Sequence, residues 1–128
     1  MSPAALNPTA TPAAAPASDP ALHARIEKAR ALAVRFPDRA PPHFSLGRAL
    51  QDAGAWAEAL THYRRAAALQ PDLMMAHLHA AECALALGDA SLARVDAEAA
   101  QRLARQQGHS GPLVEATSLL EAIDDLDD

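Results

Sequence analysis

The chain has 128 residues and a formal net charge of −5, and half of its residues are hydrophobic although only 3% are aromatic. This length allows one domain with a modest core, and the alanine-rich, β-branch-poor composition favours packed helices over a sandwich or barrel. Without Asp19 and the five acids of the last eight residues, ten acidic residues oppose eleven Lys and Arg. A nearly neutral body without a basic stripe argues against a nucleic-acid partner. The N-terminus lacks the pattern of a secretory signal, and no stretch approaches the roughly 20 apolar residues of a membrane helix.

Residues 1–18 contain Ala, Pro, Ser and Thr without charge, which predicts a disordered leader. The ordered domain is expected over 19–126. It should begin with a lone helix over 20–36, because Asp19 can accept from first-turn amides and Pro20 fits the first helical position. Pro37 ends this helix. Its apolar stripe has alternating spacings of four and three: Leu22, Ile26, Ala29, Ala33 and Phe36.

Two helical hairpins should follow, over 40–72 and 73–106. Gly54 and Gly88 suit the left-handed residue at each hairpin turn, and Asp72 and Asp89 are expected to cap the helices that follow them.

A last helix is expected over 112–126, after the break at 108–112. Its stripe is Leu113, Ala116, Leu120 and Ile123, with Leu119 beside it. It should cover the end of the second hairpin and fray into the acidic terminus. That terminus is interpreted as a solubilising tail, with docking on a basic partner or on a neighbour's basic helix over 25–39 as the alternative.

The two hairpins echo each other with a period of 34 residues. Pro37-Asp38 returns as Pro71-Asp72, and His43 returns as His77. A fixed period of this length is typical of stacked helix–turn–helix units. The first hairpin follows the pattern W-x2-L-G-x2-Y, A-x3-F, P with these residues: His43, Leu46, Gly47, Leu50, Ala59, Tyr63 and Pro71. Two of them depart from it, His43 at the aromatic position and Leu50 at the tyrosine position.

The chain therefore resembles the tetratricopeptide repeat family, and in particular small bacterial proteins of two to three repeats with a C-terminal helix. The second hairpin matches more loosely, with Arg105 in place of the proline. The resemblance implies an all-α, right-handed solenoid of antiparallel hairpins with about six helices. It also implies a protein-binding scaffold whose concave groove is lined by the first helix of each hairpin.

On this geometry the groove residues fall on two helices. The first hairpin should contribute Phe44, Arg48, Gln51 and Asp52, and the second should contribute Met75, Leu78, Glu82 and Leu85. Their spacings of three and four place each set on one helix face. Apolar side chains beside single charges would suit an amphipathic helix or an extended apolar peptide.

No catalytic, metal or cofactor site is expected. The sequence contains neither G-x-x-x-x-G-K-[ST] nor H-E-x-x-H. His77 and His79, two residues apart on a helix, point in nearly opposite directions. His43 and His77 are interpreted as packed imidazoles. Cys83, the only cysteine, is expected to be buried, and a single thiol suits a reducing compartment.

The sequence thus predicts a cytoplasmic, non-enzymatic protein-binding module: an adaptor, assembly factor or small chaperone that binds a protein or peptide in its groove. A weak homodimer is possible. The alternatives are a self-assembling structural subunit and, with less support, a metal- or redox-linked protein using His43, His77 or Cys83.

Overall fold

The computed structural model describes residues 19–127, and this range forms six helices and no strand. The helices are α2 (Pro20–Arg35), α3 (Ala40–Asp52), α4 (Trp56–Leu69), α5 (Met74–Ala86), α6 (Ala90–Gln107) and α7 (Ser110–Asp127). The expected leader over 1–18 lies outside the described residues. The all-α fold expected from the periodicity is confirmed.

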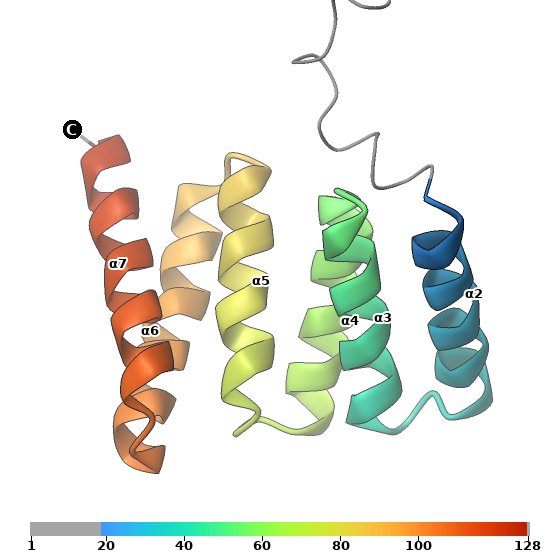
Figure 1. Ribbon diagram of the computed structural model, residues 1–128. Helices are drawn as coiled ribbons and strands as arrows, with labels where there is room; N and C mark the ends of the chain where they lie inside the picture. Colours follow the sequence, from blue (N-terminus) through green and yellow to red (C-terminus); the bar gives the residue numbers. More distant parts are fainter. Residues whose placement is uncertain (1–18, 128) are drawn as a thin grey trace, which may run out of the picture.

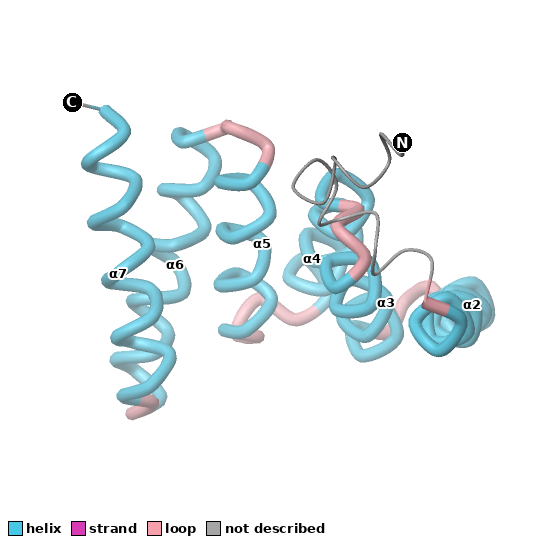
Figure 2. The backbone as a smooth tube through the Cα atoms, turned by 45° about the horizontal axis from the view of Figure 1, so that its top comes forward, coloured by secondary structure: helices cyan, strands magenta, loops and turns pink. Residues whose placement is uncertain are grey.

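The helices form a single row of antiparallel neighbours, with α2 at one end and α7 at the other (Figure 1). In that view α3, α5 and α7 lie in front, while α4 and α6 lie behind them. Turning the molecule shows α2 almost end on while α5 to α7 are still seen from the side (Figure 2). The row therefore twists along its length, as in a solenoid.

Side-chain caps fix two of the predicted helix starts. Asp19 accepts a hydrogen bond from the Ala21 amide at 2.9 Å, and Asp89 accepts one from the Leu92 amide at 3.0 Å. The prediction for Asp72 is wrong. The cap position of α5 falls one residue later, on Leu73, and no side chain caps that helix.

Gly54 and Gly88 turn the two hairpins with φ of 76° and 82°, so the left-handed turn residues are confirmed. Gly108 ends α6 in the same conformation, at φ 75°. The last helix begins earlier than expected, at Ser110, because Pro112 falls in its first turn, where the backbone amides need no helical partner. It extends to Asp127, one residue beyond the expected end.

The core is a chain of small clusters between successive helices rather than one central core. The first cluster joins residues of α2, α3, α4 and α5: Ala29, Ala33, Leu46, Leu50, Ala59, Tyr63, Ala80 and Cys83. The second, fourth and fifth clusters tie α5 to α6 and α7, with Ile123 of the last helix fully buried. The third joins Ala40, Ala66 and Ala76 of α3, α4 and α5. Alanine dominates these contacts because short side chains let the helices pack closely.

Tyr63 is the exception, as the largest fully buried side chain in the described range. Its ring lies against Gly47 of α3, where a built Cβ atom would approach Tyr63 Cε1 to 2.8 Å. Only glycine leaves room for this ring, which explains the residue at that place in the repeat pattern.

Candidate functional site

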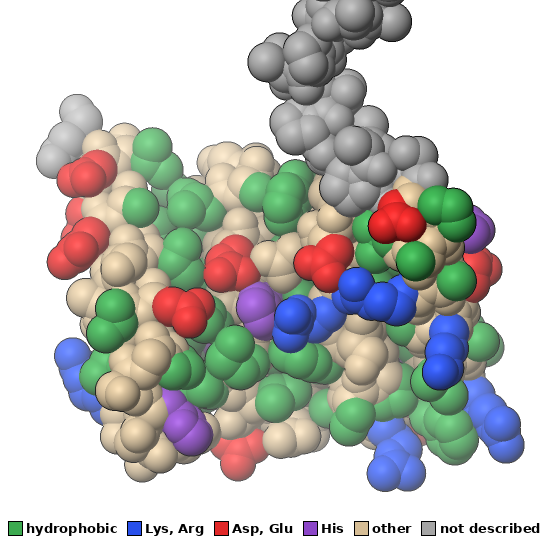
Figure 3. All heavy atoms as spheres, viewed as in Figure 1, with side chains coloured by type: hydrophobic (Ala, Val, Ile, Leu, Met, Phe, Trp, Pro, Cys, Tyr) green, Lys and Arg blue, Asp and Glu red, His purple; other side chains and the backbone are tan. Residues whose placement is uncertain are grey.

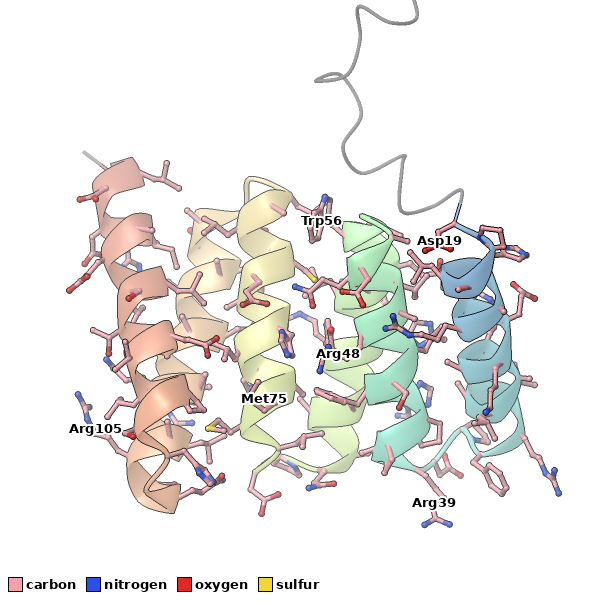
Figure 4. The ribbon with its side chains drawn as sticks, in the orientation of Figure 1. Asp19, Arg39, Arg48, Trp56, Met75 and Arg105 are labelled. Atoms are coloured by element: carbon pink, nitrogen blue, oxygen red, sulfur yellow. The ribbon has the colours of Figure 1, made fainter. Side chains whose placement is uncertain are left out.

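The front face of the molecule, formed by α3, α5 and α7, carries some of the side chains expected in the groove. On α3, Arg48 is exposed and projects toward α5 (Figure 4). Asp52 is exposed at the end of α3 and pairs with Arg25 of α2 at 2.9 Å. Figure 3 shows apolar side chains on this face between α3 and α5, with charged groups around them.

Phe44 is half-buried and is part of the fold as well as of the front face. It packs against the first and third core clusters, and its ring lies 5.7 Å from the Tyr63 ring and 5.9 Å from the His79 ring, between centroids. Only part of this side chain is available to a partner. A charge introduced here would disturb the core as well as the surface.

The α5 residues divide between surface and core. Met75 is half-buried, and Leu85 is half-buried against the cluster of α5, α6 and α7. Leu78 is fully buried with Ala100 and Ala116. The expectation that Leu78 lines the groove is therefore wrong in this structure, because α7 packs over that part of α5.

Gln51 and Glu82 meet in a hydrogen-bonded network beneath the front face. Tyr63 Oη donates to Gln51 Oε1 at 2.6 Å, and Gln51 Nε2 donates to Glu82 Oε1 at 2.8 Å. His79 Nδ1 lies 2.7 Å from the same Glu82 oxygen. The network joins α3, α4 and α5, so it fixes the two predicted groove helices relative to each other.

The network sets the charge state of its members. Burial on its own would raise the pKa of Glu82, but the hydrogen bonds from His79 and Gln51 outweigh it, so the pKa falls below its usual value. Glu82 is therefore ionised at neutral pH, and His79 Nδ1 is the donor to it. Burial raises the pKa of Tyr63, which keeps its hydroxyl a hydrogen-bond donor.

The sequence analysis does not predict that His79 and Tyr63 contact each other and help to hold this site together. The two rings stack with centroids 5.4 Å apart and an interplanar angle of 24°. The spacing of His79 and Glu82, three residues apart on one helix, is the signal that could have found the pair. Their contact with Gln51 depends on how α3 stacks on α5, which no local spacing reveals.

The repeated histidines bind backbone carbonyls. His43 Nε2 lies 2.8 Å from the Pro37 carbonyl oxygen, and His77 Nε2 lies 3.0 Å from that of Pro71. Both bonds join residues six positions apart. The proline and histidine that recur after 34 residues therefore form the same hydrogen bond in each repeat. It anchors the loop before each first helix to that helix.

The remaining candidate reactive groups, His43 and Cys83, also have structural surroundings that explain them. His43 Nδ1 lies 3.2 Å from His62 Nδ1. Burial raises the pKa of the Cys83 thiol to about 12, which leaves little reactive thiolate. Residues 19–127 contain no group of three or more metal-ligating side chains. Within that range no helix is both long enough and apolar enough to cross a membrane.

The fold is a helical repeat similar to that of tetratricopeptide repeat proteins. Solved structures share this fold over the whole chain. PcrH in complex with the chaperone binding region of PopD matches with a TM-score of 0.80 and 26% identity, over 100% of this chain and 97% of that one. The type III secretion translocator chaperone SycD of Yersinia enterocolitica matches with a TM-score of 0.79 and 23% identity, over 99% and 88%.

The TPR2B domain of yeast Sti1 also matches, with a TM-score of 0.73 and 17% identity over 79% of this chain and 81% of that one. At their identities SycD and Sti1 establish the fold alone. No family profile and no curated protein sequence matches the chain. The resemblance to the tetratricopeptide repeat seen in the sequence is confirmed by these neighbours.

Proposed function

We propose that this chain is a non-enzymatic, peptide-binding chaperone or adaptor that holds an extended segment of another protein on its front face. The observation that carries the proposal is the match, over the whole chain, to PcrH solved with the chaperone binding region of PopD. A cytoplasmic location, as expected from the sequence, fits this role and stays a prediction.

The front face suggests which kind of segment binds. Phe44 and Met75 offer partly exposed apolar surface, and each apolar side chain buried against such a surface contributes up to roughly 1.5–3 kcal/mol before ordering costs. Glu82 is half-buried and already accepts hydrogen bonds from His79 and Gln51. Arg48 is therefore the exposed charge that a partner meets between α3 and α5, and it favours a peptide with apolar side chains and a nearby carboxylate.

The test is a reversal of charge preference. Two fluorescent peptides are prepared that share one apolar sequence and differ only by Glu or Lys at a central position. Fluorescence anisotropy should show the wild type binding the Glu peptide more tightly. Arg48→Glu should reverse that order, because the attraction becomes a repulsion.

Arg102 of α6 provides the matched control, since it is also exposed but lies on a helix behind the front face. Arg102→Glu makes the same change in net charge and should leave the preference unaltered. An unchanged order in Arg48→Glu, or the same shift in Arg102→Glu, would contradict the proposed site.

A further inference from the structure

Each end of the helix row carries half of a hairpin. The α2 helix stands 34 residues before α4, the second helix of a hairpin, yet no first helix precedes α2 among the described residues. At the other end, α7 packs on α5 and α6 in the place of a first helix. Within residues 19–127 the row therefore runs from a second helix to a first helix, so its two ends present opposite halves of the repeated unit.

The α2 end retains part of the surface on which a first helix would pack, although α3 already covers Ala29 and pairs with Arg25 through Asp52. On α4 the residues buried against α3 are Ala59, Tyr63 and Ala66. The residues 34 positions earlier are Arg25, Ala29 and Leu32. Leu32 is 40% exposed, and Phe36, one turn further on, is 37% exposed.

A cavity of about 200 Å³ lies at this place, lined by Arg25, Lys28, Ala29, Leu32 and Ser45. We name these five residues the α2 slot. Its floor is apolar, and its rim carries Lys28 together with Arg25, which pairs with Asp52 of α3. Lys28 forms no ion pair within residues 19–127, so its charge is available to a partner.

The α7 end presents a complementary surface. Opposite the buried Ala116 and Ile123, this helix carries four exposed residues at spacings of four, three and four: Val114, Ser118, Glu121 and Asp125. We name these four the α7 outer face. Neither of its acids forms an ion pair within residues 19–127. Figure 3 shows acidic side chains along α7 and basic ones toward α2, at opposite ends of the molecule.

We propose that the α7 outer face of one copy docks in the α2 slot of a second copy, so that two half-hairpins complete one unit. In Figure 1, α7 and α2 run in opposite directions, as α3 and α4 do, so the new pair would be antiparallel. In that orientation Val114 meets Leu32, and Glu121 lies near Lys28. A contact between two different surfaces does not close on itself, so copies add head to tail and the mean mass rises with concentration.

Two variants, each blocked on one surface, test this arrangement in the full-length chain. Leu32→Glu places an acid in the slot, and Val114→Lys places a base on the α7 outer face. Leu32 is 40% exposed and Val114 is 64% exposed, so neither change puts a charge into the closed core. Circular dichroism and melting curves verify the fold. Sedimentation velocity should show concentration-dependent mass for the wild type and a monomer for each variant alone.

The decisive sample is the equimolar mixture of the two variants. Each supplies the surface that the other lacks, so the mixture should form a one-to-one dimer and nothing larger. Raising the salt concentration should weaken it, because both surfaces carry exposed charge. A mixture that stays monomeric overturns the proposal. A dimer formed by Val114→Lys alone also overturns it, because that variant has only its α2 slot intact and would have to pair slot against slot.

Two further outcomes separate the other possible occupants of the slot. If residues 1–18 fill it, the wild type stays monomeric and self-association begins only when they are deleted, which overturns the proposal. If the chain is monomeric both with and without those residues, neither they nor a second copy occupies the slot. That result also overturns the proposal and indicates a different protein as the occupant. Arg48→Glu should self-associate like the wild type, so failure of peptide binding and failure of self-association are measured independently.

Discussion

Replacing Gly47 by alanine sets two effects of opposite sign against each other. In an isolated helix alanine is more favourable than glycine by about 1 kcal/mol. In this protein the new Cβ atom would lie 2.8 Å from Tyr63 Cε1 and 2.9 Å from Cδ1. The ring has no room to retreat, because it is fully buried and stacks on His79.

We expect steric strain to win. Overpacking a core typically costs about 1–3 kcal/mol, and a displaced ring would also weaken the 2.6 Å hydrogen bond from Tyr63 to Gln51, worth about 0.5–1.5 kcal/mol. After the gain in helix propensity, the free energy of unfolding should fall by about 1–3 kcal/mol. Urea denaturation followed by circular dichroism measures this difference.

Gly111 supplies the control, since it is helical and a Cβ atom there meets nothing within 4 Å. Gly111→Ala should leave stability unchanged or raise it by up to about 1 kcal/mol. In a Tyr63→Leu background, Gly47→Ala should lose its penalty. Gly47→Ala as stable as the wild type, or an undiminished penalty without the tyrosine ring, would refute the reasoning.

Three further predictions concern polar groups. Tyr63→Phe should lower the free energy of unfolding by about 1–2 kcal/mol in urea, because Gln51 Oε1 loses its donor. Burial lowers the pKa of His62 below 6.5, so the unfolded chain binds that proton at higher pH than the folded chain. Melting curves should therefore show stability falling as pH drops below about 6.5, and less steeply in His62→Gln. Asp89→Ala removes the hydrogen bond to the Leu92 amide, and calorimetry should show a loss of about 1 kcal/mol, which Asp89→Asn should largely restore.

Helices and turns could be predicted because their signals are local. The left-handed glycines at Gly54 and Gly88 stand at the turns of the two hairpins, and Asp19 and Asp89 cap the helices that follow them. The 34-residue period also places residues on equivalent helix faces. Such features need no knowledge of how the helices stack.

The site was predicted less well because it depends on stacking. Leu78 has the spacing of a surface residue, but α7 covers it through Ala116. His79 was dismissed as one of two divergent histidines, yet it bonds Glu82 and stacks on Tyr63. The spacing of residues within α5 cannot show that His79 stacks on Tyr63, because Tyr63 lies on α4.

Tyr63 links the fold to the proposed function. Its ring packs against Gly47 of α3 and stacks on His79 of α5, while its hydroxyl holds Gln51. The same side chain thus supports both helices of the front face, because the alanines around it are too small to fix their relative position. A substitution at a half-buried residue such as Phe44 changes this support and the binding surface together. Exposed residues outside the core clusters, such as Arg48, allow binding to be tested with less effect on the fold.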